Sequence, residues 1–321
     1  MLSISSNAAE LNNEPMGEKW QLKMNAAFEM GKRMLAAGCE ERGANIMACG
    51  QRIDYKYCPE CGQYEVINTS LCRDRMCPLC SWRLGLKRYA EMMQVMDELL
   101  PIIKKGHTVG MLTLTVRNVS LKKLSETLDK MALAYKRMSQ RVTWKKQIMG
   151  YARNLEITRN EDDGSFHPHY HILVVCHEGV EPGVAILSIA REWGEGLEAD
   201  YIPICDGAEA YSNKDGKVLE GDLTGAILEC SKYATKPGIT RMMNDEELAE
   251  YSSILSGRQL ISYGGIIAEE RQKLGITDRR TDQEPAGSIL KIKDKCECGA
   301  DMQGIIAEWA GGSQWTRAEM E

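Results

Sequence analysis

The chain has 321 residues, a net charge of −6 at pH 7, 27% charged and 43% hydrophobic residues, an ordinary composition for a globular protein of about two domains. Its apolar runs are too short to cross a bilayer, so we expect no membrane-spanning helix. The N-terminus lacks a basic segment followed by an apolar stretch, which argues against a signal peptide and for a cytoplasmic protein. In that compartment, twelve cysteines indicate metal ligands or free thiols rather than disulfides.

The net charge conceals a basic middle segment. Residues 71–160 contain 18 Lys and Arg against 7 Asp and Glu, a local charge of +11, so the remainder of the chain is strongly acidic. A basic segment between acidic ends is compatible with phosphate binding, although solvated helix faces would produce the same pattern.

Residues 1–50 are predicted to be a polar leader with one helix, and residues 51–86 a cysteine-rich module. The module contains two C-x2-C pairs separated by 15 residues, the spacing of a four-cysteine zinc site. We therefore predict a Zn²⁺ ion bound by Cys58, Cys61, Cys77 and Cys80. Cys72 is then left over, and the isolated Cys39 and Cys49 are expected to be structural. The basic residues around the second pair would allow contact with a DNA backbone.

The next segment alternates helices and strands. Residues 87–105 have helical spacing of apolar residues, and residues 111–116 alternate apolar residues with threonine, as a strand does. A helix over residues 120–141 leads to a strand at 150–158. A polar turn then connects this strand to another at 166–175, which predicts a β-hairpin.

The second hairpin strand carries three histidines at alternate positions. Alternate side chains share one face of a strand, so His169 and His171 point the same way, with Cα atoms about 7 Å apart. That spacing suits two imidazoles bound to one metal ion. His167 is a further candidate ligand. Glu156 on the neighbouring strand is the predicted third ligand, and its alternative role is an exposed edge residue. Such a mixed nitrogen and oxygen set accepts Mn²⁺, Mg²⁺ or Zn²⁺, any of which would stabilise charge on a phosphoryl group.

A helix predicted over residues 222–235 supplies candidate catalytic side chains. Glu229 and Tyr233 are four residues apart and therefore neighbours on one helix face, with Lys236 nearby. Tyr233 could attack a phosphate as a phenolate, assisted by a metal ion or by the Lys236 ammonium group. Glu229 could instead activate water and hydrolyse a phosphodiester. Tyr233 as an ordinary core residue is the remaining alternative.

Residues 241–321 are predicted to be acidic and mostly helical. Cys296 and Cys298 in this region amount to half of a metal site, and the sequence assigns them no role.

Three ordered motifs resemble a known family. They are residues 111–119 (MLTLTVRNV), 167–171 (HPHYH) and 232–236 (KYATK), supported by the segments 72–83 and 260–265. Together they resemble the motifs of plasmid rolling-circle replication initiators, the Rep proteins of the HUH endonuclease superfamily. The resemblance implies an origin-specific nickase that joins its tyrosine to a 5′ phosphate and leaves a 3′ hydroxyl as primer.

The resemblance also implies roles for individual residues. His169 and His171 would be the metal pair and Glu156 a further ligand, whereas the family pair does not require His167. Tyr233 would be the nucleophile, and Glu229 would activate water at termination. The expected metal is Mn²⁺ or Mg²⁺.

The expected architecture is an α+β fold. An HUH-type antiparallel sheet with packed helices (residues 87–240) follows the zinc module, and the helical C-terminal region comes last. The expected partner is double-strand origin DNA of a plasmid, single-stranded at the nick, with no membrane. A host helicase and a second copy of the chain are candidate partners.

The sequence is compatible with two other functions. An HUH transposase or conjugative relaxase would share the chemistry and differ in the DNA sequence that it nicks. A non-catalytic, zinc-containing DNA-binding regulator would need neither a metal ion at the histidines nor a covalent intermediate.

Overall fold

The computed structural model describes residues 18–214, 217–220, 223–231, 237–277, 295–311 and 314–320. The chain divides into two compact units, one formed by Met1–Trp82 with Asp278–Glu321 and the other by Arg83–Thr277. The C-terminal residues thus belong with the cysteine-rich segment, which the expected order of four consecutive segments did not anticipate. Within the described ranges, no helix combines the length and the apolar character needed to span a membrane.

The first unit contains a four-stranded antiparallel sheet in the order β10-β9-β1-β2, with two N-terminal helices. Its elements are α2 (Glu18–Ala36), α3 (Glu40–Met47), β1 (Arg52–Tyr57), β2 (Tyr64–Thr69), β9 (Gln303–Gly311) and β10 (Gln314–Glu319). Helix α2 buries Trp20, Met24 and Ala27, whose helical spacing forms one apolar stripe. The end of the chain, beyond the helices of the C-terminal region, forms a β-hairpin of β9 and β10.

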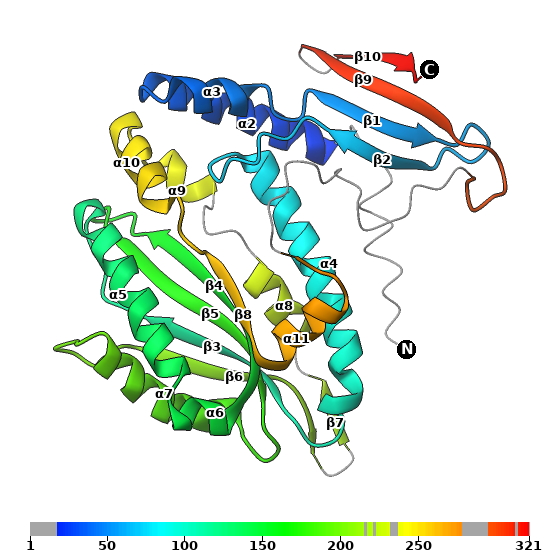
Figure 1. Cartoon of the computed structure of the whole chain (residues 1–321). Coiled ribbons are helices and arrows are strands. Elements are labelled where there is room, and N and C mark those ends of the chain that lie inside the picture. The colour runs from blue at the N-terminus through cyan, green and yellow to red at the C-terminus, as the bar shows by residue number, and fades with distance from the viewer. Residues whose placement is uncertain are drawn as a thin grey trace. The chain divides into compact units, whose positions relative to one another are not determined.

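The second unit is built on a six-stranded antiparallel sheet in the order β7-β6-β3-β5-β4-β8 (Figure 1). Its strands are β3 (Val109–Thr115), β4 (Ile148–Arg159), β5 (Phe166–Cys176), β6 (Cys205–Lys214), β7 (Lys217–Glu220) and β8 (Ile261–Gly264). Its helices are α4 (Pro78–Ile103, which begins in the first unit), α5 (Leu121–Ser139), α6 (Val142–Gln147), α7 (Pro182–Gly196), α8 (Leu223–Ser231), α9 (Pro237–Arg241), α10 (Asp245–Leu255) and α11 (Gly265–Lys273). The α+β fold with an antiparallel sheet is as predicted.

Helices cover both faces of this sheet, with α5 and α7 on one side and α4, α8 and α11 on the other (Figure 1). The central strand β5 is therefore buried on both faces. Tyr170 contacts the rings of Tyr135 on α5 and Trp193 on α7. Leu173 and Val175, which have the opposite parity, lie in the core formed with α4 and α8. His169 and His171 share the parity of Leu173, so they face the α8 side.

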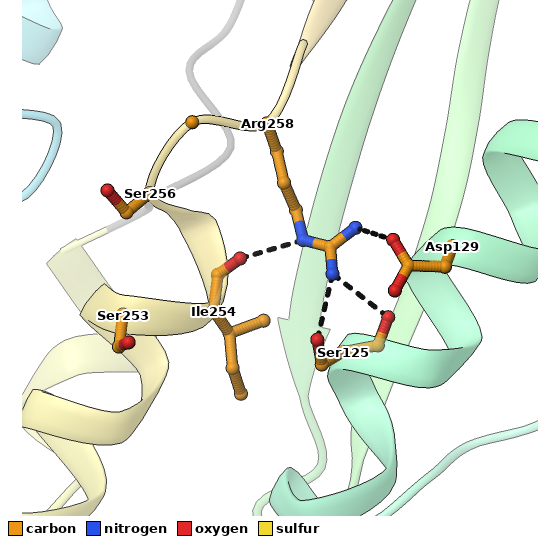
Figure 2. Close-up of a pocket in the computed structure, with 7 residues that line it drawn as sticks. Ser125, Asp129, Ser253, Ile254, Ser256 and Arg258 are labelled. Atoms are coloured by element: carbon orange, nitrogen blue, oxygen red, sulfur yellow. Dashed lines mark hydrogen bonds and ion pairs between the residues drawn. The ribbon is translucent and has the colours of Figure 1, made fainter.

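Arg258 joins the end of α10 to α5 (Figure 2). Its guanidinium group pairs with Asp129 and donates to the Ser125 carbonyl and hydroxyl oxygens at 3.0 and 2.8 Å. Its Nε also donates to the Ile254 carbonyl oxygen. These contacts lie in an open hollow lined by residues of both helices, so we assign Arg258 a structural role.

Candidate metal centre and catalytic site

Three candidate ligands converge from two adjacent strands. Glu156 on β4 is the cross-strand partner of His169 on β5, and His171 lies two residues further on the same face. The ligand atoms of all three side chains lie within 4.8 Å of one another. The predicted hairpin is therefore the element that assembles the group.

The interatomic distances match the size of a small cation. The two Nε2 atoms of His169 and His171 are 3.1 Å apart, and Glu156 oxygens lie 4.0 and 3.5 Å from them. Ligands about 2.1 Å from one ion are separated by about 3.0–3.4 Å in octahedral or tetrahedral arrangements. Glu156 is only 2% exposed, and a buried carboxylate is favourable next to positive charge. The donor set therefore fits a divalent cation.

Hydrogen bonds at the other ring nitrogens orient both histidines. His169 Nδ1 lies 3.2 Å from the backbone oxygen of His167, an atom that only accepts, so Nδ1 carries the proton. His171 Nδ1 lies 3.3 Å from the Thr113 hydroxyl on β3. A protonated Nδ1 leaves the Nε2 lone pair for a metal ion, which is the usual arrangement of metal-binding histidines.

His167 lies outside this group of three. Its Nδ1 is 2.9 Å from Asn118 Oδ1, in the loop that follows β3. Burial lowers the pKa of His167, and the neighbouring His169 lowers it further. His167 thus supports the site as a neighbour of His169, whose ring it contacts at a centroid distance of 5.2 Å.

Helix α8 brings one more predicted residue to the centre. Glu229 Oε1 lies 3.5 Å from His171 Nε2, and the Glu229 side chain is 29% exposed. A partly exposed carboxylate beside the ligand atoms can contact both the cation and incoming solvent. The other two catalytic residues predicted from sequence, Tyr233 and Lys236, lie outside the described residues.

The cysteines form two clusters rather than the single predicted set. Cys58 and Cys61 lie with the C-terminal cysteines, to which the sequence assigned no role. Cys77 and Cys80 lie with Cys49 and Cys72, which were not predicted to be ligands. The clusters are Cys58, Cys61, Cys296 and Cys298, and Cys49, Cys72, Cys77 and Cys80. The backbone N–H of Cys61 lowers the pKa of Cys58 to about 7, which favours the thiolate form that metals bind.

Sequence reasoning missed several residues of these sites. The alternation of threonine with apolar residues in β3 places Thr113 on a polar face of the strand. It does not indicate which histidine the Thr113 hydroxyl contacts. Asn118 was part of a recognised motif without an assigned role. Cys49, Cys72, Cys296 and Cys298 lack C-x2-C spacing with their cluster partners, so no local pattern identifies them.

The sheet with its histidine pair and acidic side chains defines an α+β protein of HUH endonuclease architecture. The sequence model of the replication protein family matches residues 63–315. The chain therefore belongs to the replication protein family of plasmid rolling-circle initiators, in agreement with the three ordered motifs.

Individual relatives cover most of the chain. The Rep protein of Streptococcus pneumoniae serotype 2 is 29% identical over 260 residues, which are 79% of this chain and 78% of the relative. The Rep protein of Bacillus amyloliquefaciens is 27% identical over 300 residues, 88% of this chain and 86% of the relative. A replication protein of Staphylococcus aureus is 30% identical over 221 residues, 65% of this chain and 90% of the relative. No solved structure gives a significant match.

Proposed function

We propose that this chain initiates plasmid rolling-circle replication by nicking and rejoining one DNA strand at the origin. The observation that supports the proposal is the convergence of Glu156, His169 and His171 with the Glu229 carboxylate on one side of the sheet. In an initiator, such a centre would bind a phosphate of the strand that is cut. The proposed metal ion is Mn²⁺ or Mg²⁺, which the mixed donor set accepts.

When bound, the cation would supply Lewis-acid stabilisation of the charge that develops on the phosphoryl oxygens. The chain itself would supply the nucleophile. In the proposed step the Tyr233 oxygen forms a bond to phosphorus and the bond to the 3′ oxygen breaks. The products are a 5′-phosphotyrosine ester and a free 3′ hydroxyl, which takes up a proton. Lys236 is proposed to favour the phenolate form of Tyr233.

Glu229 is proposed to act at termination. A carboxylate beside His171 and partly open to solvent is suited to remove a proton from water. That water would attack phosphorus in place of a tyrosine oxygen, the bond to the 3′ oxygen would break, and the cycle would end by hydrolysis. Glu229 would thus be dispensable for the first nick and required for release.

The proposed DNA partner is the double-strand origin of a plasmid, single-stranded where it is nicked. The basic residues 71–160 provide charge for sequence-independent contacts to phosphates. A host helicase that opens the duplex and a second copy of the chain are proposed as further partners.

The decisive experiment uses supercoiled plasmid that carries its own origin, together with Mn²⁺ or Mg²⁺. The wild-type protein should relax the plasmid and leave a covalent protein–DNA adduct. Tyr233→Phe should reduce adduct formation by about 10³-fold or more, because the hydroxyl that forms the ester is gone. Tyr57→Phe, a matched change on β1, should have no effect. An undiminished adduct in Tyr233→Phe would reject the nucleophile assignment.

A second variant tests termination. Glu229→Ala should still nick but should accumulate uncleared adduct and little closed single-stranded product. Glu250→Ala, an exposed position on α10, serves as the control. Normal termination by Glu229→Ala would reject its proposed role. Nicking at transposon ends or at a transfer origin would favour a transposase or relaxase. Origin binding without any adduct would favour a non-catalytic regulator.

A further inference from the structure

We propose that the first unit binds two structural zinc ions, one in each cysteine cluster, and that the second ion fastens the C-terminal β-hairpin to β1. We call Cys49, Cys72, Cys77 and Cys80 the N-terminal cluster, and Cys58, Cys61, Cys296 and Cys298 the closing cluster. The inference concerns folding of this unit and does not rest on the nicking activity.

The N-terminal cluster is arranged around Cys80. Cys80 Sγ lies 3.4 Å from Cys49 Sγ and 3.7 Å from Cys72 Sγ. Cys77 precedes Pro78, the first residue of α4, and Cys80 is the third residue of that helix, so both thiols lie at a helix N-terminus, where negative charge is favoured. Three backbone N–H groups donate to sulfurs of this cluster: that of Cys72 to Cys49 Sγ, that of Arg73 to Cys80 Sγ and that of Cys80 to Cys77 Sγ, at 3.2 to 3.5 Å.

The closing cluster joins two tight turns from distant parts of the chain. The Cys58 and Cys298 sulfurs are 3.5 Å apart, and those of Cys61 and Cys296 are 3.3 Å apart, across 240 and 235 residues of sequence. Each turn ends in a glycine with positive φ, Gly62 at 74° and Gly299 at 91°. Only glycine adopts this conformation without strain, and it lets the chain fold back so that both cysteines of each turn face the other pair.

The sulfur separations indicate a shared ion in both clusters. Four sulfurs about 2.3 Å from a tetrahedral Zn²⁺ are about 3.8 Å from one another, whereas a disulfide bond is about 2.0 Å long. The closest separations in both clusters are 3.3 to 3.7 Å, near the edges of such a tetrahedron. Four thiolates without nitrogen or oxygen ligands are typical of closed, structural zinc sites.

The position of the closing cluster explains what its ion would do. Cys58 directly follows the last residue of β1, Tyr57, which pairs with Gln303 at the start of β9. Cys298 precedes that strand by five residues. The ion would therefore clamp the open end of the β1–β9 pair and fix its register. A small sheet with a limited core gains much of its stability from such a clamp, because metal binding is coupled to folding.

The test measures the zinc content of the full-length protein by inductively coupled plasma mass spectrometry. The protein is purified without chelator. We expect two zinc ions per chain in the wild type and in Cys39→Ser, the control, since Cys39 belongs to neither cluster. Cys298→Ser and Cys72→Ser should each retain one. X-ray absorption of the wild type should show four sulfur ligands at about 2.3 Å and no nitrogen ligands.

Hydrogen exchange of Cys298→Ser distinguishes loss of the clamp from global unfolding. Amides of β9 should lose protection while those of α4 keep it. One zinc ion per wild-type chain, unchanged in Cys298→Ser, would instead support a single site and overturn the proposal. Two cross-linked cysteine pairs without zinc, detected by intact mass after alkylation, would overturn it as well.

Discussion

At the scale of single residues, a hydroxyl group contacts one of the candidate metal ligands. Thr113 Oγ1 lies 3.3 Å from His171 Nδ1 and fixes the ring with Nε2 toward Glu156. We expect Thr113→Val to weaken Mn²⁺ binding by about 10-fold, the lower end of the effect of a ligand-orienting partner. The measurement is a Mn²⁺ titration followed by electron paramagnetic resonance.

A second substitution of Thr113 distinguishes orientation of the His171 ring by the hydroxyl from packing of the side chain. Thr113→Ser keeps the hydroxyl and should restore the affinity to within about 2- to 3-fold, although it lacks the methyl group. If Thr113→Ser binds as weakly as Thr113→Val while both melt like the wild type, the hydroxyl does not orient His171. Glu156→Gln provides the reference for loss of a direct ligand.

The cluster of Glu156, His169 and His171 could be predicted from the sequence because its members are close in sequence. Glu156 and His169 are separated by one hairpin turn, so the strand period and the turn signal together place them side by side. The family resemblance already left His167 outside the histidine pair, although its parity puts it on the same face of the strand. Only the position of Asn118 shows that its ring is held by a different partner.

At the scale of elements, the turn between β4 and β5 sets the register on which the centre depends. The Ser165 hydroxyl, and then its backbone N–H at 2.9 Å, hold the pKa of Asp163 below its usual range. The charged form is therefore favoured in the folded state. The resulting stability is present above the unfolded pKa of 3.8 and is lost as the pH falls through the lower folded value.

This pKa shift predicts a pH-dependent effect of Asp163→Asn. The variant should be less stable than the wild type at about pH 7, and the difference should be smaller at about pH 3, because the contribution of the carboxylate declines once the pH falls below the unfolded pKa of 3.8. Urea unfolding at both pH values measures it. Asp162→Asn in the same turn is the control, since Asn160 binds the backbone N–H of Asp162 rather than its carboxylate. If the difference in unfolding free energy persists at low pH, Asp163 stabilises the turn through its side-chain geometry and not through its negative charge.

Strands with a clear pattern of apolar residues were predicted from the sequence, whereas the C-terminal strands β9 and β10 were not. The predicted strands at 111–116, 150–158 and 166–175 correspond to β3, β4 and β5, since each shows alternation or a buried apolar run. Strand β9 has the sequence QGIIAEWAG, in which a short apolar run suits a helix as well as a strand. Pairing with β1, far away in the sequence, decides its conformation.

At the scale of the whole molecule, the composition of the cysteine clusters cannot be predicted from local sequence spacing. C-x2-C spacing singles out two cysteine pairs, each of which lies in a different candidate cluster, but the partner of each pair depends on the tertiary fold. The closing cluster joins residues 235 and 240 positions apart, so an unaligned sequence offers no reason to prefer Cys298 over Cys77 as a partner of Cys58. Spacing rules therefore find one pair of each cluster and leave its partner pair open.

The proposed histidine centre and the proposed cysteine sites differ chemically and should respond differently to a chelator. Closed four-thiolate sites bind Zn²⁺ with apparent free energies of about 10–16 kcal/mol, whereas a mixed nitrogen and oxygen site with open positions exchanges its ion readily. We expect brief dialysis against EDTA to abolish nicking while two zinc ions per chain remain. Addition of Mn²⁺ alone should then restore nicking, with zinc measured on the same sample. If activity returns only when Zn²⁺ is supplied, the histidine centre and the cysteine clusters do not have separate roles.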